Sequence, residues 1–225
     1  MKNSIVVYRD ADKIGTLTYT SANRKTGDMA QLQILARHES PTAAIESGTD
    51  SVVCGDCPLR KTNGKRVCYV NVAHAPLAVW KAVRRAPVTS AVKAKARLAR
   101  KGIRLGAYGD PAFLPLPLLE TLTDGRVSTG YTHQWATADR RYSRHLMASV
   151  ETLEQRTQAK AKGYRTFRVV ADLSAIADGE ILCPNYTQGI NCADCGLCNG
   201  AGKAKDIVIL AHGNGAAHLN QIEGA

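Results

Sequence analysis

The stretch HLMASVETLEQRTQAKAKGYRTFRVV, residues 145–170, predicts the fold class of this chain. Its first part, residues 145–150, and its last part, residues 164–170, are short apolar runs typical of strands. The segment between them is rich in helix-forming residues and ends at Gly163, a common residue just after a helix. A strand, a helix and a strand in this order predict a βαβ unit with two parallel strands.

The same alternation continues on both sides of this stretch. Helix-like segments are expected at residues 76–86, 90–102 and 115–125. Strand-like segments are expected at residues 103–108, 126–135 and 205–213. Repeated βαβ units predict a mostly parallel sheet with helices packed on it.

Residues 1–50 differ because they lack this alternation. They contain three short β-prone runs, at residues 4–8, 16–20 and 31–37, and then a loop-like segment at residues 38–51. We therefore expect an N-terminal β-rich extension over residues 1–50 and an α/β domain with Cys-rich loops over residues 51–225.

The composition is that of a globular protein, with 44% apolar residues in a chain of 225. No apolar run is long enough to cross a membrane. The apolar run at residues 5–8 is too short for a signal peptide. We therefore expect a cytoplasmic protein without membrane contact. In a reducing compartment disulfides are rare, and an odd number of cysteines, seven, cannot all pair.

The net charge of +11 permits contact with nucleic acid through phosphates. Solvated helix surfaces are the alternative explanation, because the basic residues are spread along the chain. They are Arg60, Lys61, Lys65, Arg66, Arg84, Arg85, Lys93, Lys95, Arg97, Arg100, Lys101, Arg104, Arg140, Arg141 and Arg144.

Polar residues follow the predicted strands at the point where each strand ends. Because the carboxyl ends of parallel strands meet at one edge of a sheet, we expect these residues to form a functional rim. Helix capping is the alternative for Glu151 and Thr152, and a simple turn is the alternative for the segment that begins at His212. The rim residues are Gly109, Asp110, Thr132, His133, Ser149, Glu151, Asp172, His212 and Asn214.

The segment NCADCGLCNG, residues 191–200, carries three cysteines at a strict three-residue interval, and a fourth lies upstream. Runs of this kind with a remote cysteine hold iron–sulfur clusters, and paired CxxC segments hold structural zinc. Four thiolates would complete either site. The set is Cys183, Cys192, Cys195 and Cys198.

A second set lies far upstream, in CGDCPLRKTNGKRVCYVN. Its three cysteines, Cys54, Cys57 and Cys68, leave one position on a metal open, as catalytic metal sites do. His74 or a downstream cysteine is a candidate fourth ligand, and one site shared by both segments is an alternative. We favour one site with three cysteines and a second site with four, because this arrangement uses all seven cysteines. The spacing favours an iron–sulfur cluster over zinc.

The segments CGDCPLR…CYVN, RLGAYGDPAFLP, GYTHQW, LMASVET…GYRTFRVV and CP…C..CGLCNG resemble a group of uncharacterised bacteriophage proteins with features of the radical S-adenosylmethionine superfamily. The resemblance covers residues 50–215. The common superfamily motif is CxxxCxxC, whereas this chain has CxxC followed by ten residues and Cys68, and Tyr69 follows that cysteine.

The resemblance implies a partial (β/α) barrel, a TIM barrel-like arrangement, in the cytoplasm of a host cell. It implies a [4Fe–4S] cluster on Cys54, Cys57 and Cys68 with S-adenosylmethionine on its open iron, and an auxiliary cluster on the other four cysteines. Asp110, His133 and Glu151 would be the catalytic residues. The cofactor-binding residues would be Gly109, Thr132, Ser149 and His212.

Three functions follow as expectations. The first is a radical S-adenosylmethionine-like enzyme with an unknown substrate. The second is a nucleic-acid-binding protein without catalysis, in which zinc or an inert cluster pins loops. The third is an electron carrier or redox sensor, which needs a cluster but no open iron.

Overall fold

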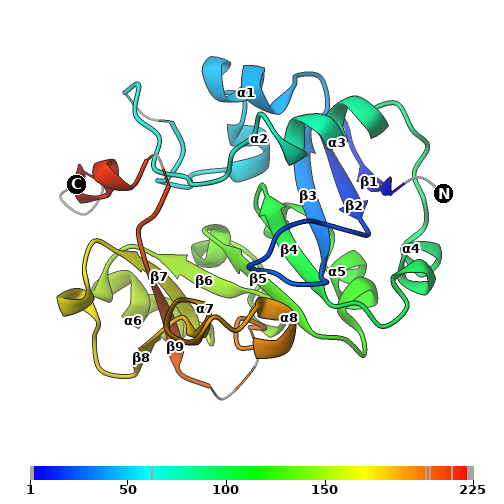
Figure 1. Cartoon of the computed structure of the whole chain (residues 1–225). Helices are drawn as coiled ribbons and strands as arrows, with labels where there is room; N and C mark the ends of the chain where they lie inside the picture. The colour runs from blue at the N-terminus through cyan, green and yellow to red at the C-terminus, as the bar shows by residue number, and fades with distance from the viewer. Residues whose placement is uncertain (1–2, 62, 201, 203, 214, 222–225) are drawn as a thin grey trace.

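The computed structural model describes residues 3–61, 63–200, 202, 204–213 and 215–221. These residues contain one nine-stranded sheet with the strand order β1-β2-β3-β4-β5-β6-β7-β9-β8 (Figure 1). The strands are β1 (Ser4–Arg9), β2 (Lys13–Thr18), β3 (Ala30–Ala36), β4 (Ile103–Tyr108), β5 (Ser128–Thr132), β6 (Met147–Val150), β7 (Thr166–Val170), β8 (Glu180–Leu182) and β9 (Asp206–Leu210). The α-helices are α1 (Pro41–Ser47), α2 (Ser51–Cys54), α3 (Ala75–Val83), α4 (Ala91–Leu98), α5 (Leu116–Thr123), α6 (Leu153–Ala161), α7 (Pro184–Gln188) and α8 (Cys192–Cys195).

The first three strands are antiparallel to one another. Asp10 holds the turn between β1 and β2, because its carboxylate accepts hydrogen bonds from the backbone N–H groups of Asp12 and Lys13 at 2.9 and 2.8 Å. Three strands are present here as predicted, but β2 begins earlier than expected, at Lys13. β3 then pairs in parallel with β4, so the sheet continues across the expected boundary at residue 50.

The prediction of a loop at residues 38–51 was wrong, because this segment contains α1. Ser40 caps the helix by accepting a hydrogen bond from the N–H of Ala43, and Pro41 occupies the first turn, where its missing N–H costs nothing. Gly48 ends the helix with a φ of 81°. Short capped helices of this kind are easily mistaken for turns.

From β3 onward neighbouring strands are parallel, and β3 to β7 lie in chain order. The connections carry α3 and α4 between β3 and β4, α5 between β4 and β5, and α6 between β6 and β7. The α/β class with a mostly parallel sheet is therefore confirmed. The sheet is open, with β1 and β8 as its two edge strands, and it does not close into a barrel.

The Cys-rich segments are partly helical, which corrects the expectation of loops. Cys54 ends α2, and Cys192 begins α8. Asn191 caps α8 by accepting a hydrogen bond from the N–H of Asp194 at 3.1 Å, and Gly196 ends it in the left-handed conformation. β8, α7 and α8 were not predicted from the sequence.

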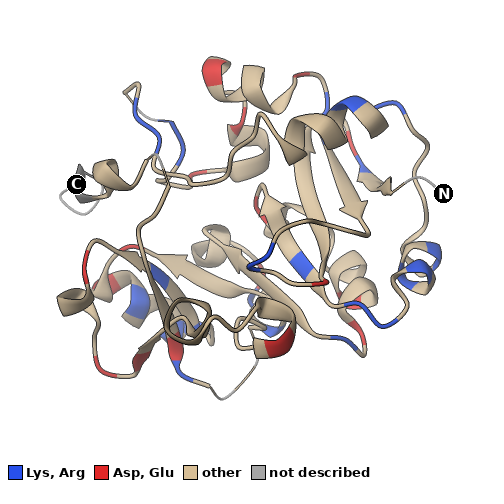
Figure 2. Cartoon of the chain, in the orientation of Figure 1, with Lys and Arg blue, Asp and Glu red and all other residues tan. Residues whose placement is uncertain are grey.

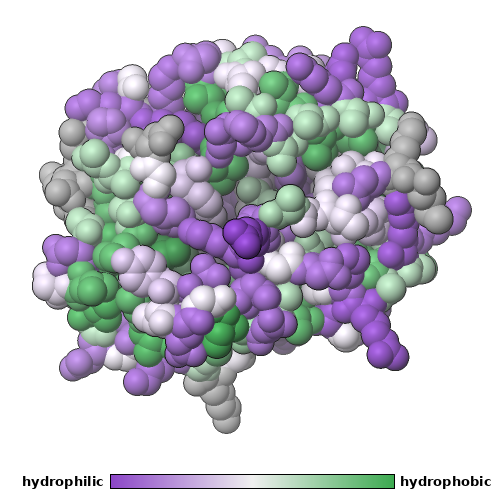
Figure 3. Space-filling model, in the orientation of Figure 1, coloured by the Kyte–Doolittle hydropathy of each residue, from purple (hydrophilic) through white to green (hydrophobic). Residues whose placement is uncertain are grey.

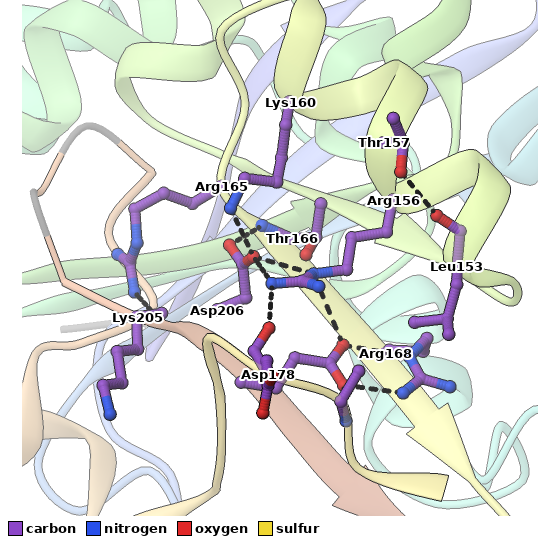
Figure 4. Close-up of polar contacts among 12 residues, drawn as sticks. Leu153, Arg156, Thr157, Lys160, Arg165, Thr166, Arg168, Asp178, Lys205 and Asp206 are labelled. Carbon is purple, nitrogen blue, oxygen red and sulfur yellow. Dashed lines mark hydrogen bonds and ion pairs between the residues drawn. The ribbon is translucent and has the colours of Figure 1, made fainter.

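A buried polar network joins α6 to β7, β8 and β9 (Figure 4). Arg156 on α6 donates to the carboxylate of Asp206 at 2.9 Å. Arg168 on β7 pairs with Glu180 on β8, with N···O distances of 3.0 and 2.6 Å. Because buried charges are costly unless they are paired and hydrogen-bonded, this network specifies how β8 joins the sheet.

The described residues contain no helix both long and apolar enough to span a membrane. On the face seen in Figure 3, hydrophilic and hydrophobic residues are interspersed.

Candidate functional site

The cysteines of the upstream set, Cys54, Cys57 and Cys68, lie together at the carboxyl edge of the sheet. The N–H of Asp110, two residues after the end of β4, donates to the carbonyl of Val53 at 2.7 Å, which fixes α2 at this edge. Burial raises the pKa of the Cys54 thiol, and the neighbouring Cys57 and Cys68 raise it further. We refer to these three residues as the three-cysteine group.

Asp110 connects this edge to the next strand. It is buried, and its carboxylate accepts hydrogen bonds from the N–H of Ala112 at 2.9 Å and the N–H of His133 at 2.8 Å. Burial raises the pKa of Asp110, while these donors and the nearby imidazole of His133 lower it, with a net upward shift. Asp110 therefore positions the start of the segment that follows β5.

His133 lies between a carboxylate and a thiol. Its Nε2 is 2.9 Å from Oε1 of Glu151 and 3.9 Å from Sγ of Cys57. The two contacts use the same ring nitrogen, so the arrangement is not a relay in which the carboxylate orients a base toward a nucleophile. The three predicted catalytic residues are thus brought together beside Cys57.

The imidazole of His133 is favoured in its charged form. Burial acts to lower its pKa, but Cys57 and Glu151 act more strongly in the opposite direction, so the pKa is raised well above its usual value. The site therefore holds a cation between two groups that are anionic when deprotonated.

Arg60 holds the segment that carries the three-cysteine group. Its guanidinium donates to Asp50 Oδ1 at 3.1 and 2.5 Å and to the carbonyl oxygens of Gly55 and Gly48 at 3.0 and 2.8 Å. Asp50 is buried, so this pair is a desolvated, multiply bonded contact rather than a surface salt bridge. It ties the loop after α2 to the end of α1.

The downstream cysteines form a second group. Burial raises the pKa of Cys198 to about 12, and Cys183 and Cys192 act in the same direction. Burial also raises the pKa of Cys192, and the neighbouring thiols of Cys183 and Cys195 act in the same direction. We refer to Cys183, Cys192, Cys195 and Cys198 as the four-cysteine group.

Arg165 holds the segment of the four-cysteine group, as Arg60 holds the other. It donates to the carbonyl oxygens of Leu197, Ala204 and Lys205 at 2.6, 2.9 and 2.5 Å. Figure 4 shows its side chain extending from the residue directly before β7 toward Lys205. Each cysteine segment is therefore fixed by an arginine that donates to backbone carbonyls.

Two residues beside the four-cysteine group, Arg104 and Tyr131, were not predicted as site residues. Arg104 on β4, counted there with the basic surface residues, is buried and lies over the ring of Tyr131 on β5, with its Cζ 4.4 Å from the ring centroid. Both line a cavity of about 600 Å³, which we call the central cavity. The available signal was a charged residue inside the apolar run IRLGAY.

The thiols are grouped but do not form a ready-made chelate. Among the described residues, no group of three or more His, Cys, Asp or Glu side chains is arranged to hold a metal ion. The donor chemistry nevertheless fits, because each group consists of thiols, which lose protons when they bind metals. His74, the candidate fourth ligand, lies at the start of α3 and lines the central cavity.

The predicted cofactor-binding residues occupy different places. Gly109 and Thr132 lie beside Asp110 and His133, and the carbonyl of Ser149 accepts a hydrogen bond from Trp135 Nε1 at 3.0 Å. His212 instead packs on Tyr69, with ring centroids 4.8 Å apart, at the central cavity. Asp172 is a local cap that accepts from the N–H of Ser174, and Asn214 lies outside the described residues.

Comparison of the chain with family models, with curated proteins and with solved structures gave no match.

Proposed function

We propose that this chain is an iron–sulfur protein with a radical S-adenosylmethionine-like activity. The three-cysteine group would hold a [4Fe–4S] cluster with one open iron, and the four-cysteine group would hold an auxiliary cluster. One observation supports the proposal: the thiol neighbours that raise the pKa of Cys54 and Cys68 belong to the three-cysteine group, and those that raise the pKa of Cys192 and Cys198 belong to the four-cysteine group. A site with three thiols leaves a position for a further ligand, and a site with four does not.

The strand arrangement supports this proposal. β3 to β7 follow one another in chain order, and residues from β3, β4, β5, β7 and β9 line the central cavity. This shared lining is compatible with a sheet that curves around the cavity. We infer a partial barrel-like arrangement with the three-cysteine group at the carboxyl edge, where α/β proteins place their reactive groups.

When bound, S-adenosylmethionine on the open iron would supply an organic radical by reductive cleavage. The protein's own part is to fix the edge on which this group would lie. Asp110 holds the backbone of His133, and Glu151 holds its ring beside Cys57. The imidazolium of His133 would partly offset the negative charge of the thiolates.

The decisive measurement is iron, sulfide and zinc content together with the visible spectrum of the anaerobically purified chain. We expect brown protein with stoichiometric iron and sulfide. The variants Cys68→Ser and Cys198→Ser should each remove part of this absorption, and the surface variant Thr157→Ala should not. Colourless protein with stoichiometric zinc would overturn the proposal.

Binding of S-adenosylmethionine separates the enzyme from an electron carrier. We expect binding to the reduced wild-type protein and to Cys198→Ser, but not to Cys68→Ser. A chain that retains both clusters but neither binds nor cleaves S-adenosylmethionine would be an electron carrier or redox sensor.

The second candidate is a nucleic-acid-binding protein pinned by zinc or by an inert cluster. The net charge of +11 favours it, although Figure 2 shows the Lys and Arg residues distributed over many elements. We expect stoichiometric zinc and salt-dependent binding of single- or double-stranded DNA if this candidate is correct. For both candidates we propose a cytoplasmic location.

A further inference from the structure

The central cavity contains a buried charge without a carboxylate partner among the described residues. Arg104 is 7% exposed, and its guanidinium lies over the ring of Tyr131, with Cζ 4.4 Å from the ring centroid. No carboxylate of a described residue forms an ion pair with Arg104.

A second buried polar group in this cavity lacks a partner. Gln33 on β3 is 4% exposed, and its Oε1 has no hydrogen-bond partner among the described residues. Gln31, two residues earlier on the same face of β3, lies opposite Arg104 in the strand register. A buried amide oxygen without a donor is destabilising, so a ligand that donates a hydrogen bond to it would relieve this cost.

The rest of the lining is compatible with an anion. Lys25, His74 and His212 line the cavity together with Arg104, and none of its described lining residues is Asp or Glu. Lys25 Nζ is 3.1 Å from His212 Nε2 at the cavity. Phe167 stacks on Tyr131 at a centroid distance of 3.9 Å, which places an aromatic wall beside the guanidinium. The cavity therefore combines positive charge with a largely apolar and aromatic surface.

We propose that the central cavity binds a small organic anion, a phosphate or carboxylate, with Arg104 as its ion-pair partner and Gln33 as the acceptor for a hydroxyl or amino group of the same ligand. Arginine matches both anions because its guanidinium donates two parallel hydrogen bonds to them. A cavity of about 600 Å³ has the size of a small-molecule site. This inference goes beyond the proposed function, because it assigns a ligand to the central cavity rather than to the cysteine groups.

Paired probes that differ in charge test the proposal by calorimetry on the full chain. The phosphate pair is adenosine monophosphate and adenosine, and the carboxylate pair is para-hydroxybenzoate and para-hydroxybenzamide. We expect at least one anion to bind more tightly than its neutral counterpart. The pair that shows the difference identifies the anion class. Arg104→Met should weaken this binding by about tenfold to a hundredfold, and the exposed control Arg85→Met should not.

A second variant keeps the test decisive if Arg104→Met does not fold. Ala78 is an exposed residue of α3 that lines the cavity, so Ala78→Trp should obstruct it without disturbing the core. Ala161→Trp on the exposed end of α6 is the matched control. We expect Ala78→Trp to lose anion binding while its melting temperature stays that of the control.

Two results would overturn the proposal. One is that neither anion binds better than its neutral counterpart. The other is that Arg104→Met changes the iron content or visible spectrum but not the anion affinity, which would make Arg104 a counter-ion of the four-cysteine group. Because iron is measured on the same samples, failure of the anion site and failure of the iron–sulfur proposal are distinguished.

Discussion

His133 Nε2 lies 2.9 Å from Glu151 Oε1, although the two residues follow different strands, β5 and β6. The contact exists because β5 and β6 are parallel neighbours, so the segments after them emerge at the same edge of the sheet. Both side chains are largely buried, with exposed fractions of 15% and 10%. The contact between His133 and Glu151 is therefore a specific feature of this edge.

Glu151→Gln should lower the free energy of unfolding by about 1–3 kcal/mol, because it replaces a charge-assisted hydrogen bond in a buried place by a neutral one. Chemical denaturation measures this change. Glu154→Gln, three residues later on the exposed side of α6, is the matched control and should change stability by less than about 0.5 kcal/mol. Equal effects of the two variants would contradict the importance of the His133 contact.

Arg60→Met should loosen the segment of the three-cysteine group. It leaves the buried carboxylate of Asp50 without its partner and frees two carbonyl oxygens, at a cost of about 1–3 kcal/mol. Hydrogen exchange should become faster in residues 54–68 than in β6. Lys61→Met, which removes a surface pair with Glu46, should leave the exchange unchanged.

Gly109→Ala should be strongly destabilising, although glycine has no side chain that could hold a ligand. Its φ is +75°, and an added Cβ would lie 2.6 Å from the carbonyl oxygen of Ile34. Gly48→Ala is a matched control, since its φ is +81° but no atom lies within 4 Å of the added Cβ. We expect thermal unfolding to show a larger loss for Gly109→Ala, by about 1 kcal/mol or more, because it adds a clash to the same backbone strain.

The lowered pKa of Asp206 predicts that the folded protein loses stability in acid. Burial acts to raise its pKa, but the N–H of Thr166 and the cations Arg156 and Lys160 act more strongly, so its pKa lies below the usual value. A carboxyl with a lowered folded pKa stabilises the fold above its unfolded pKa of about 3.9, and this contribution is lost as the pH falls through the folded pKa.

Asp206→Asn measures that contribution. The variant should be less stable than the wild type near neutral pH, and the difference should shrink as the pH falls below about 4. Urea denaturation across this pH range is the appropriate experiment. A difference that stays constant with pH would show that the effect comes from lost hydrogen bonds rather than from charge.

Local patterns were sufficient for much of the fold. The helix expected from residue 90 onward is present as α4, which Ser90 caps, and the strand–helix–strand unit at residues 145–170 is present as β6, α6 and β7. The prediction failed where local signals are short. α4 ends at Leu98, directly before Ala99 with its φ of 51°, rather than at Gly102, and β8 is only three residues long.

The edge residues were predictable for a similar reason. The positions of Asp110, His133 and Glu151 after successive strands are a property of the chain, and parallel pairing then brings them together. His212 follows β9 in the same manner, but it packs with Tyr69 at the central cavity instead. Strand order determines which strand ends are neighbours, and the periodicity of the sequence does not reveal the strand order.

The alternation of strands and helices and the spacing of the seven cysteines can be read from the chain, because both depend on residues close together in it. The burial of Arg104 beside Tyr131, where a surface charge was expected, becomes visible only in the folded protein. Burial and charge pairing depend on which side chains the neighbouring strands place around a residue. At Arg104 those neighbours supply aromatic rings, an amide and thiols, but no carboxylate among the described residues.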